Sequence, residues 1–307
     1  MKNNPWENMK ITSIKRISSK ISFNIFWAKD SLSRYCYLIK LKEDIPLKKI
    51  NLKEIEIIYN KDYANEFLIV LKDSKNWEIF LILCKDLIET SLLVKTEKEL
   101  IEKTYERLNE WKNLLKSNYK NKLSFEEQMG LFTELNTLNN IISKKVNLTM
   151  AINSWRGAER ELQDFLCEKS AIEVKSTISS KGNTVTISSL HQLESVKEKF
   201  FLIFYSLSQG MNGETITNLV EKIDKKIDTE EAKILFYKKL LNVGYDLLEE
   251  DYEKFIIDKV EFYQITEEFP KITSKDLDSR IKEVKYKINL TGCASFKVTE
   301  ETVEENI

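Results

Sequence analysis

The sequence contains few of the residues that break, cross-link or functionalise a chain. Its 307 residues include three prolines, seven glycines, four cysteines and one histidine, His191. No Cys-x-x-Cys pair occurs, and structural zinc sites usually show such close ligand pairs, so a zinc centre is not expected. One histidine leaves a single base for Ser/His or Cys/His catalysis, and no nucleophile stands out beside it. We expect four buried, reduced thiols: Cys36, Cys84, Cys167 and Cys293.

An excess of charge and long hydrophobic runs are also missing. Lys and Arg number 48 and Asp and Glu 49, so the formal charge is -1 and no global positive field attracts a polyanion. Any nucleic-acid contact must therefore rest on a local basic surface or on a partner. No segment reaches the ~18 apolar residues of a membrane helix, and Met1 to Lys10 lacks a secretory apolar region. We expect a cytoplasmic protein with a sizeable hydrophobic core.

The first predicted module, residues 1–118, is β-rich. Five runs of β-branched and aromatic residues bounded by polar turns predict short strands: Ile21 to Ala28, Arg34 to Leu41, Ile55 to Tyr59, Glu66 to Lys72 and Trp77 to Cys84. Apolar residues at helical spacing then predict a helix from Lys98 to Leu115 that closes the module. Lys116 to Lys122 is the predicted linker.

The second module, residues 119–208, begins with a clear helix signal. Ser124 followed by Glu127 forms a capping box ahead of an apolar run that ends near Ile142. Strand-like runs and one short helix follow it: Thr149 to Trp155, Leu162 to Cys167, Ala171 to Ile178, Thr184 to Ser188, the helix Ser189 to Lys197, and Phe200 to Leu207. This order of helix, three strands, an extra strand, helix and strand predicts a mixed central sheet flanked by helices.

The remaining residues, 209–307, predict an α+β extension packed on that core. Two helices are expected over Thr215 to Ile227 and Thr229 to Val243, with Gly244 as the C-cap of the second. Strands follow over Phe255 to Ile265 and Lys282 to Asn289. The acidic tail from Glu300 is expected to be frayed.

The most informative pattern is an acid followed, after a turn, by Glu-x-Lys in a β-prone run. In a strand, the period of two places Glu173 and Lys175 on one face, and Asp164 on the neighbouring strand can share a cation with Glu173. Metal-dependent nucleases of the PD-(D/E)XK type present their catalytic groups in this way. The plain alternative is a solvated sheet face with an incidental ion pair, and Glu283-Val284-Lys285 is a strand-like decoy.

Several segments resemble a bacterial family of PD-(D/E)XK proteins, formerly a domain of unknown function, that is found beside restriction-modification and phage-defence genes. The segments are Phe80 to Ile88, Gly130 to Leu135, Trp155 to Gly157, Gln163 to Phe165, Ile172 to Thr177, Val185 to Ser189 with Gln192-Leu193, Phe269-Pro270 and Val284 to Leu290. The likeness covers nearly the whole chain and implies the restriction-endonuclease-like fold. Two positions depart from the pattern: Thr133 replaces a small residue, and Gln163 stands in place of the proline.

Phosphodiester hydrolysis gives each of these groups a role. Asp164, Glu173 and the backbone carbonyl of Val174 could hold Mg²⁺, which prefers hard oxygen ligands and keeps several waters; Mn²⁺ could substitute. A bound cation lowers the pKa of its water and polarises the phosphoryl group. Lys175 would orient or deprotonate the attacking water, or contact the scissile phosphate.

Two further residues are candidates for the site. Glu134 lies within an apolar helical stripe, where an unpaired carboxylate is costly, so it either reaches the metal or pairs with Lys144, Lys145 or a more distant lysine. Gln192 either bonds the phosphate or Lys175, or caps the short helix. His191 is expected to be an ordinary helix residue.

Two hypotheses of function follow from these observations. The first is a Mg²⁺-dependent endonuclease of a restriction-modification or antiphage system, acting on double-stranded DNA with helicase-like, ATPase or methyltransferase partners. Double-strand cleavage needs two active sites, which a homodimer would supply. The alternative is a non-catalytic DNA-binding or assembly subunit that keeps the nuclease scaffold, and the near-neutral charge favours it.

Overall fold

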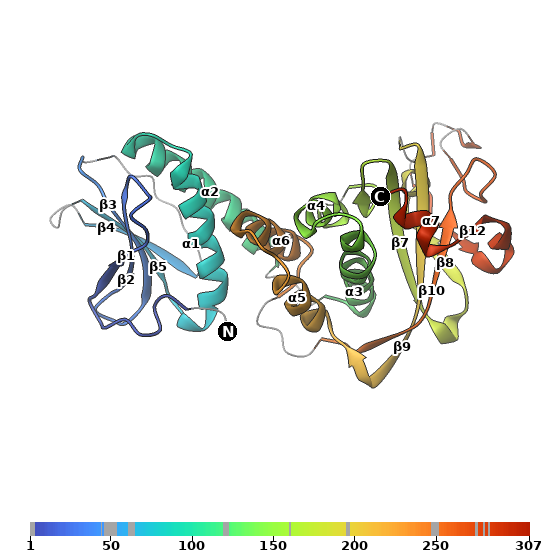
Figure 1. Ribbon diagram of the computed structural model, residues 1–307, viewed down its shortest axis with the longest axis horizontal. Coiled ribbons are helices and arrows are strands. Elements are labelled where there is room, and N and C mark those ends of the chain that lie inside the picture. Colours follow the sequence, from blue (N-terminus) through green and yellow to red (C-terminus); the bar gives the residue numbers. More distant parts are fainter. Residues whose placement is uncertain are drawn as a thin grey trace. The chain divides into compact units, whose positions relative to one another are not determined.

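The computed structural model in Figure 1 describes residues 4–43, 45, 54–60, 65–118, 123–159, 161–194, 197–246, 252–273, 276–278, 280–281 and 283–307. It divides into two compact units, Met1–Lys120 and Asn121–Ile307. Of the predicted linker Lys116 to Lys122, residues 119–122 lie outside the described residues. Among the described helices, none is both long and apolar enough to cross a membrane.

The first unit is a five-stranded antiparallel sheet with two helices. The strands are β1 (Ile14–Arg16), β2 (Asn24–Lys29), β3 (Tyr35–Lys40), β4 (Ile55–Asn60) and β5 (Glu66–Leu71), in the spatial order β1-β2-β3-β5-β4. Helices α1 (Trp77–Leu92) and α2 (Glu97–Asn118) follow. Trp6 is fully buried and stacks on Tyr35 and on Phe80 of α1, so the segment before β1 is tied to the sheet and to a helix.

The predicted strand from Trp77 to Cys84 was wrong, because this segment begins α1. Phe80, Leu83, Cys84 and Leu87 are all buried. Their spacing of three and four residues is the helical period, and a window ending at Cys84 cuts this repeat short. The other predicted strands of the unit and its closing helix are confirmed within a few residues.

Asp86 is a buried acid on α1 that binds two side chains of α2. It is 3% exposed and accepts hydrogen bonds from Arg107 Nε at 3.0 Å and from Trp111 Nε1 at 2.8 Å. Asp86→Ala is expected to destabilise the unit by about 3 kcal/mol, because a half-buried guanidinium and a buried indole N–H both lose their acceptor. Urea unfolding followed by tryptophan fluorescence measures the loss. Glu106→Ala, which removes an exposed partner of Lys103, should cost under about 1 kcal/mol.

The second unit is built on a mixed five-stranded sheet in the order β12-β10-β9-β7-β6. Its strands are β6 (Phe165–Leu166), β7 (Ser170–Ile178), β9 (Lys199–Glu214), β10 (Phe255–Gln264) and β12 (Lys297–Val298). Only β7 and β9 are parallel; the other neighbours run antiparallel. Strands β10 and β12 come from residues 209–307, so this C-terminal part shares one sheet with the predicted nuclease core.

Helices and a small second sheet lie on either side of this sheet. Helix α3 (Phe125–Asn140) packs against β7, and Thr137 on α3 bonds Tyr205 of β9 at 2.9 Å. Near α3 lie α4 (Leu148–Ser154), α5 (Ile216–Asp224) and α6 (Glu230–Asn242) (Figure 1). Phe200, Leu202 and Phe204 of β9 turn the other way, into a core shared with the antiparallel pair β8 (Thr184–Ile187) and β11 (Tyr286–Asn289).

Three predictions in this unit need correction. Thr149 to Trp155 is not a strand but mainly helix α4: Asn147 caps it by accepting from the Met150 N–H, and Ala151 and Ile152 are buried. In Ser189 to Lys197, the described residues form a 3₁₀ turn, Leu190–Leu193, in place of the predicted helix, and residues 195 and 196 lie outside the described residues. The acidic tail is not frayed, since α7 (Glu300–Glu304) is capped by Thr299 and buries Val303. The Ser124 capping box is confirmed, and Gly244 adopts φ +92°, as an αL C-cap requires.

Candidate active site

The Asp164, Glu173 and Lys175 side chains come together on β7 beside the residue at which β6 begins. The antiparallel register pairs Phe165 with Ile172, so one residue further Asp164 stands opposite Glu173. The Asp164 carboxylate accepts a 2.7 Å hydrogen bond from the Val174 N–H. Lys175 Nζ lies 2.6 Å from Glu173 Oε1, which is the shared face expected of residues two apart on a strand.

Glu134 enters this group from α3. Its carboxylate accepts a 2.7 Å hydrogen bond from Trp155 Nε1. The predicted alternatives, Lys144 and Lys145, are occupied elsewhere, since both pair with Glu304 of α7. Glu134 therefore faces Asp164 and Glu173 rather than those two lysines.

Gly157 marks how closely Glu134 and Asp164 approach each other. A Cβ atom built on Gly157 would lie 2.7 Å from Asp164 Oδ1 and 2.9 Å from Glu134 Oε2. Both oxygens thus lie within 3.0 Å of one point that only a glycine leaves free. The backbone of the same turn is bound to Asp164, because the N–H groups of Arg156 and Gly157 both donate to the Asp164 carbonyl, at 2.7 and 3.0 Å.

The close approach of three carboxylates changes their protonation. Burial, followed by repulsion from Asp164, raises the pKa of Glu173 to about 8. Burial and the Asp164 charge raise the pKa of Glu134 well above its ordinary value, and burial raises that of Asp164. Burial alone would lower the pKa of Lys175, but attraction by Glu173 and Asp164 outweighs it and the pKa is raised. The three carboxylates repel one another and share one ammonium, so an added cation would stabilise their ionised forms.

The sequence matches the model of a known protein family. A family model described as "Putative PD-(D/E)XK family member, (DUF4420)" matches residues 2–291. The chain belongs to this family. Membership confirms the resemblance and indicates a nuclease-like function. The association with restriction-modification and phage-defence genes stays a prediction. No curated protein and no solved structure matches the chain.

The carboxylate oxygens of Glu134, Asp164 and Glu173 are hard donors, the type that Mg²⁺ prefers. Glu173 Oε2 is buried and has no hydrogen-bond partner among the described residues, so this oxygen has an unused capacity to accept a bond or a cation. In an extended strand the N–H and C=O of one residue point to the same edge, so the Val174 carbonyl is directed to the side on which Asp164 bonds its N–H. Within the part of the chain that the structure describes, no three His, Cys, Asp or Glu side chains already form a ligand set.

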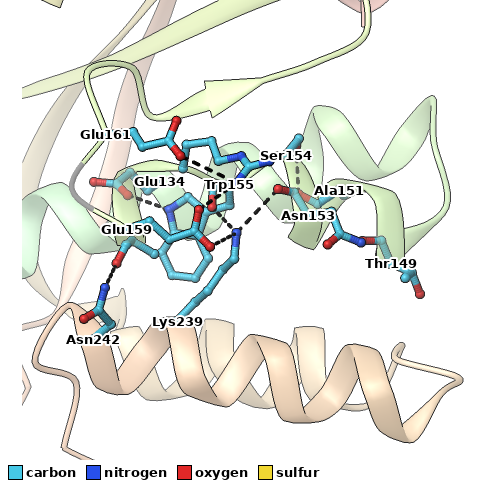
Figure 2. A network of polar contacts seen from close by, with 12 residues as sticks. Glu134, Thr149, Ala151, Asn153, Ser154, Trp155, Glu159, Glu161, Lys239 and Asn242 are labelled. Carbon is cyan, nitrogen blue, oxygen red and sulfur yellow. Dashed lines mark hydrogen bonds and ion pairs between the residues drawn. The ribbon is translucent and has the colours of Figure 1, made fainter. Parts of the chain in front are cut away.

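A buried lysine on α6 supports the turn that carries Trp155 and Gly157 (Figure 2). Lys239 is 4% exposed, and its ammonium donates to the Trp155 carbonyl and, at 3.4 Å, to the Asn153 carbonyl. These carbonyls close the C-terminal end of α4, where a positive charge is favourable. Asn242, one turn further along α6, bonds the Ala158 carbonyl. Through this turn α6 holds the indole that orients Glu134.

Lys239→Met is expected to lower the free energy of unfolding by about 1–3 kcal/mol at pH 7, because the Trp155 and Asn153 carbonyls lose their donor and Glu159, 3.5 Å from the ammonium, loses its cation. Burial lowers the pKa of Lys239 below its unfolded value of 10.5. Between the folded pKa and 10.5 the unfolded chain binds more protons, so the stability of the wild type rises with pH and the gap to the variant widens. Urea unfolding at pH 7 and pH 10 measures both effects. The exposed Lys225→Met is the control; a gap of constant size would contradict a desolvated ammonium.

The other predicted site residues lie apart from this cluster. Gln192 accepts a 2.7 Å bond from the Ser188 N–H, one residue before the N-cap of the 3₁₀ turn, and no described contact joins it to Lys175. His191 is exposed and pairs with Glu194 at 2.9 Å. The sequence pattern marks Gln163 only as the residue in place of proline, but the structure gives its side chain a further role. Its amide donates to the carbonyls of His191 and Glu194, at 3.2 and 2.7 Å, and so ties the residue before Asp164 to the 3₁₀ turn.

Sequence reasoning also missed the roles of Trp155, Gly157 and Lys239. The Trp-Arg-Gly motif was visible, but a buried tryptophan is usually only a core residue. The sequence pattern of α6 does not predict that Lys239 bonds the Trp155 carbonyl, 84 residues earlier in the chain. These contacts depend on tertiary packing.

Proposed function

We propose that this chain is a metal-dependent DNA endonuclease that hydrolyses phosphodiester bonds with Mg²⁺, for which Mn²⁺ can substitute. One observation carries the proposal: the Asp164 carboxylate is bound to the Val174 N–H, between Glu173 and Lys175 on the same strand. The nuclease-like family supports the same reaction class.

In this proposal Asp164, Glu173 and the Val174 carbonyl hold the ion, with Glu134 as a further ligand. Bound there, Mg²⁺ would activate water and neutralise charge on the phosphoryl oxygens. Lys175, 19% exposed, is accessible to substrate and orients or deprotonates the attacking water, or contacts the scissile phosphate. Trp155 fixes Glu134 by its indole N–H, and Gly157 leaves room for both acids. Gln192 is included in the proposal as a contact to a substrate phosphate outside the carboxylate cluster.

The biological setting is part of the proposal. Double-stranded DNA is the substrate, and the enzyme acts in a restriction-modification or antiphage defence system with helicase-like, ATPase or methyltransferase partners. A homodimer would bring two active sites to the two strands. The resemblance to proteins of such loci is the support for this setting.

Nicking of supercoiled plasmid in Mg²⁺ or Mn²⁺ tests the reaction, with the protein alone and with its neighbouring gene products. Asp164→Asn should abolish most of the nicking, because it removes one charge from the ion's ligands while leaving an oxygen to accept from the Val174 N–H. Asp73→Asn, at an exposed turn of the first unit, is the control. Equal nicking by wild type and Asp164→Asn would refute the assignment.

A second function, a non-catalytic DNA-binding or assembly subunit, has its own support. Lys175 already neutralises Glu173, and no ligand set is preformed among the described side chains. Calorimetric titration with Mn²⁺ separates the two functions. A nuclease should bind Mn²⁺ in the wild type and lose it in Glu173→Gln, whereas a scaffold should show the same absence of binding in both.

A further inference from the structure

The first unit contains a concentration of positive charge that the net charge of the chain conceals. From Asn8 to Lys29 the sequence has four lysines and one arginine and no aspartate or glutamate. The net charge of the whole chain is nevertheless -1, because 49 acidic residues balance 48 basic ones. In contrast, α2 alternates its lysines with Glu97, Glu99, Glu102, Glu106 and Glu110.

These five cations follow one edge of the first sheet. Strand β1 has a neighbour on one side only, β2, and Lys15 is its central residue. At one end of β1 the Lys29 N–H donates to the Ser13 carbonyl, and the Ser13 N–H donates to the Lys10 carbonyl, so Lys10 and Lys29 flank that end. At the other end Arg16 bonds the Ser18 carbonyl, two residues before Lys20. We call Lys10, Lys15, Arg16, Lys20 and Lys29 the β1 basic surface.

The charges of this surface are not neutralised within the fold. Arg16 bonds only amide and carbonyl oxygens, and Lys29 lies over the Tyr35 ring at 5.5 Å. Across the described part of the chain, none of the five forms an ion pair with a carboxylate, whereas Arg34 and Lys40 nearby pair with Asp30 and Glu66. Lys10, Lys15, Arg16 and Lys20 are exposed. The ammonium groups of Lys10, Lys15 and Lys20 remain available to an external anion, and the charge of Arg16, whose guanidinium is bonded within the fold, adds to their field.

A pocket opens beside the same strand. It has a volume of about 380 Å³, and its walls include Asn4, Asn8, Lys15, Arg16 and Trp27. Lys15 is directly opposite Trp27 in the β1–β2 register, so both side chains are on one face of the sheet. Two amides, two cations and an aromatic ring are suited to a sugar-phosphate unit, which offers acceptor oxygens, negative charge and an apolar sugar face.

We propose that the β1 basic surface is a docking site for the phosphate backbone of double-stranded DNA. Phosphates of the duplex contact the line of cations along β1, and the pocket between Lys15 and Trp27 receives one sugar-phosphate unit. Affinity comes mainly from released counterions, so it carries little sequence preference and falls with salt. The choice of duplex DNA rests on the proposed function, while the charge of the surface does not.

Binding of the full-length protein to a fluorescent 25-base-pair duplex, measured by anisotropy in EDTA, tests this proposal. The variant Lys10→Ala/Lys15→Ala/Lys20→Ala leaves the structural Arg16 in place. Loss of three phosphate contacts should weaken binding by roughly 10²- to 10³-fold near 0.1 M salt and reduce the slope of log K against log salt by about 2.7. The matched control, Lys95→Ala/Lys98→Ala/Lys103→Ala, removes one exposed lysine just before α2 and two among the glutamates of α2, and should change affinity by less than about threefold.

The outcomes separate this proposal from the nuclease assignment. Asp164→Asn should bind the duplex as tightly as the wild type, because EDTA removes any metal ion from the Asp164 and Glu173 carboxylates. If the β1 and α2 triple variants bind equally, or if single-stranded RNA is preferred to duplex DNA, the docking proposal is wrong, even where plasmid nicking has been established. If the β1 variant alone loses affinity, the proposal stands even for a protein that does not nick DNA.

Discussion

Lys175→Met should lower the rate of plasmid nicking by roughly 10²- to 10⁴-fold, the range expected when a group that orients or deprotonates a nucleophile is lost. Methionine keeps the length of the apolar stem but removes the ammonium that lies 2.6 Å from Glu173. Mn²⁺ binding should be preserved or tightened, because the cation that competes for Glu173 has been removed. Single-turnover nicking and calorimetry together measure the two effects.

The control for this experiment is Lys169→Met, an exposed lysine in the turn before β7. It carries the same change of charge and should nick at the wild-type rate. Loss of both nicking and Mn²⁺ binding in Lys175→Met would show that the lysine acts by holding the strand together. An unchanged nicking rate would remove Lys175 from the reaction.

Gly157→Ala should weaken Mn²⁺ binding by about 10- to 100-fold, with a matching loss of nicking, while the melting temperature changes little. The added methyl group would meet Asp164 Oδ1 at 2.7 Å and Glu134 Oε2 at 2.9 Å. Both atoms are the ends of side chains, and the nearest backbone atom, Asp164 Cα, would lie 3.3 Å from the methyl group and need only a small shift. The two carboxylates are therefore pushed apart and no longer converge. Calorimetry and thermal unfolding on one preparation distinguish these effects.

Gly130→Ala is the matched control, since Gly130 is on α3, the helix that carries Glu134. A Cβ there meets nothing within 4 Å. Alanine in a helix interior should stabilise the unit by about 1 kcal/mol and leave Mn²⁺ affinity unchanged. Similar Mn²⁺ affinities for Gly157→Ala and the wild type would show that Asp164 and Glu134 do not act on one ion.

The predictable part of the site is the part encoded by residues close in sequence. The shared face of Glu173 and Lys175 follows from the strand period, and they are found in contact. The position of Asp164 beside Glu173 follows if the segment that contains Asp164 pairs with the Glu173 strand, and the β6–β7 register shows this pairing. Glu134 was recognised because an acid in an apolar stripe is costly, although the indole that binds it was not predicted.

The errors came where tertiary burial decides between helix and strand. Both Trp77 to Cys84 and Thr149 to Trp155 contain aromatic or β-branched residues in short windows, which favour a strand. In each, the buried residues recur at helical spacing or follow an N-cap, and packing on neighbouring elements stabilises the helix. Residues that act across long sequence separations, such as Lys239, leave no periodic trace.

The amide of Gln163 has a consequence for consensus design. Many superfamily signatures place proline before the first acid, and an engineer restoring it here would delete the donor that satisfies two carbonyls of residues 191 and 194. The pyrrolidine ring would rigidify one backbone bond but release the neighbouring turn. At this position the atypical residue is the one to keep, and searches that demand the proline will overlook chains that anchor their first acid in this way.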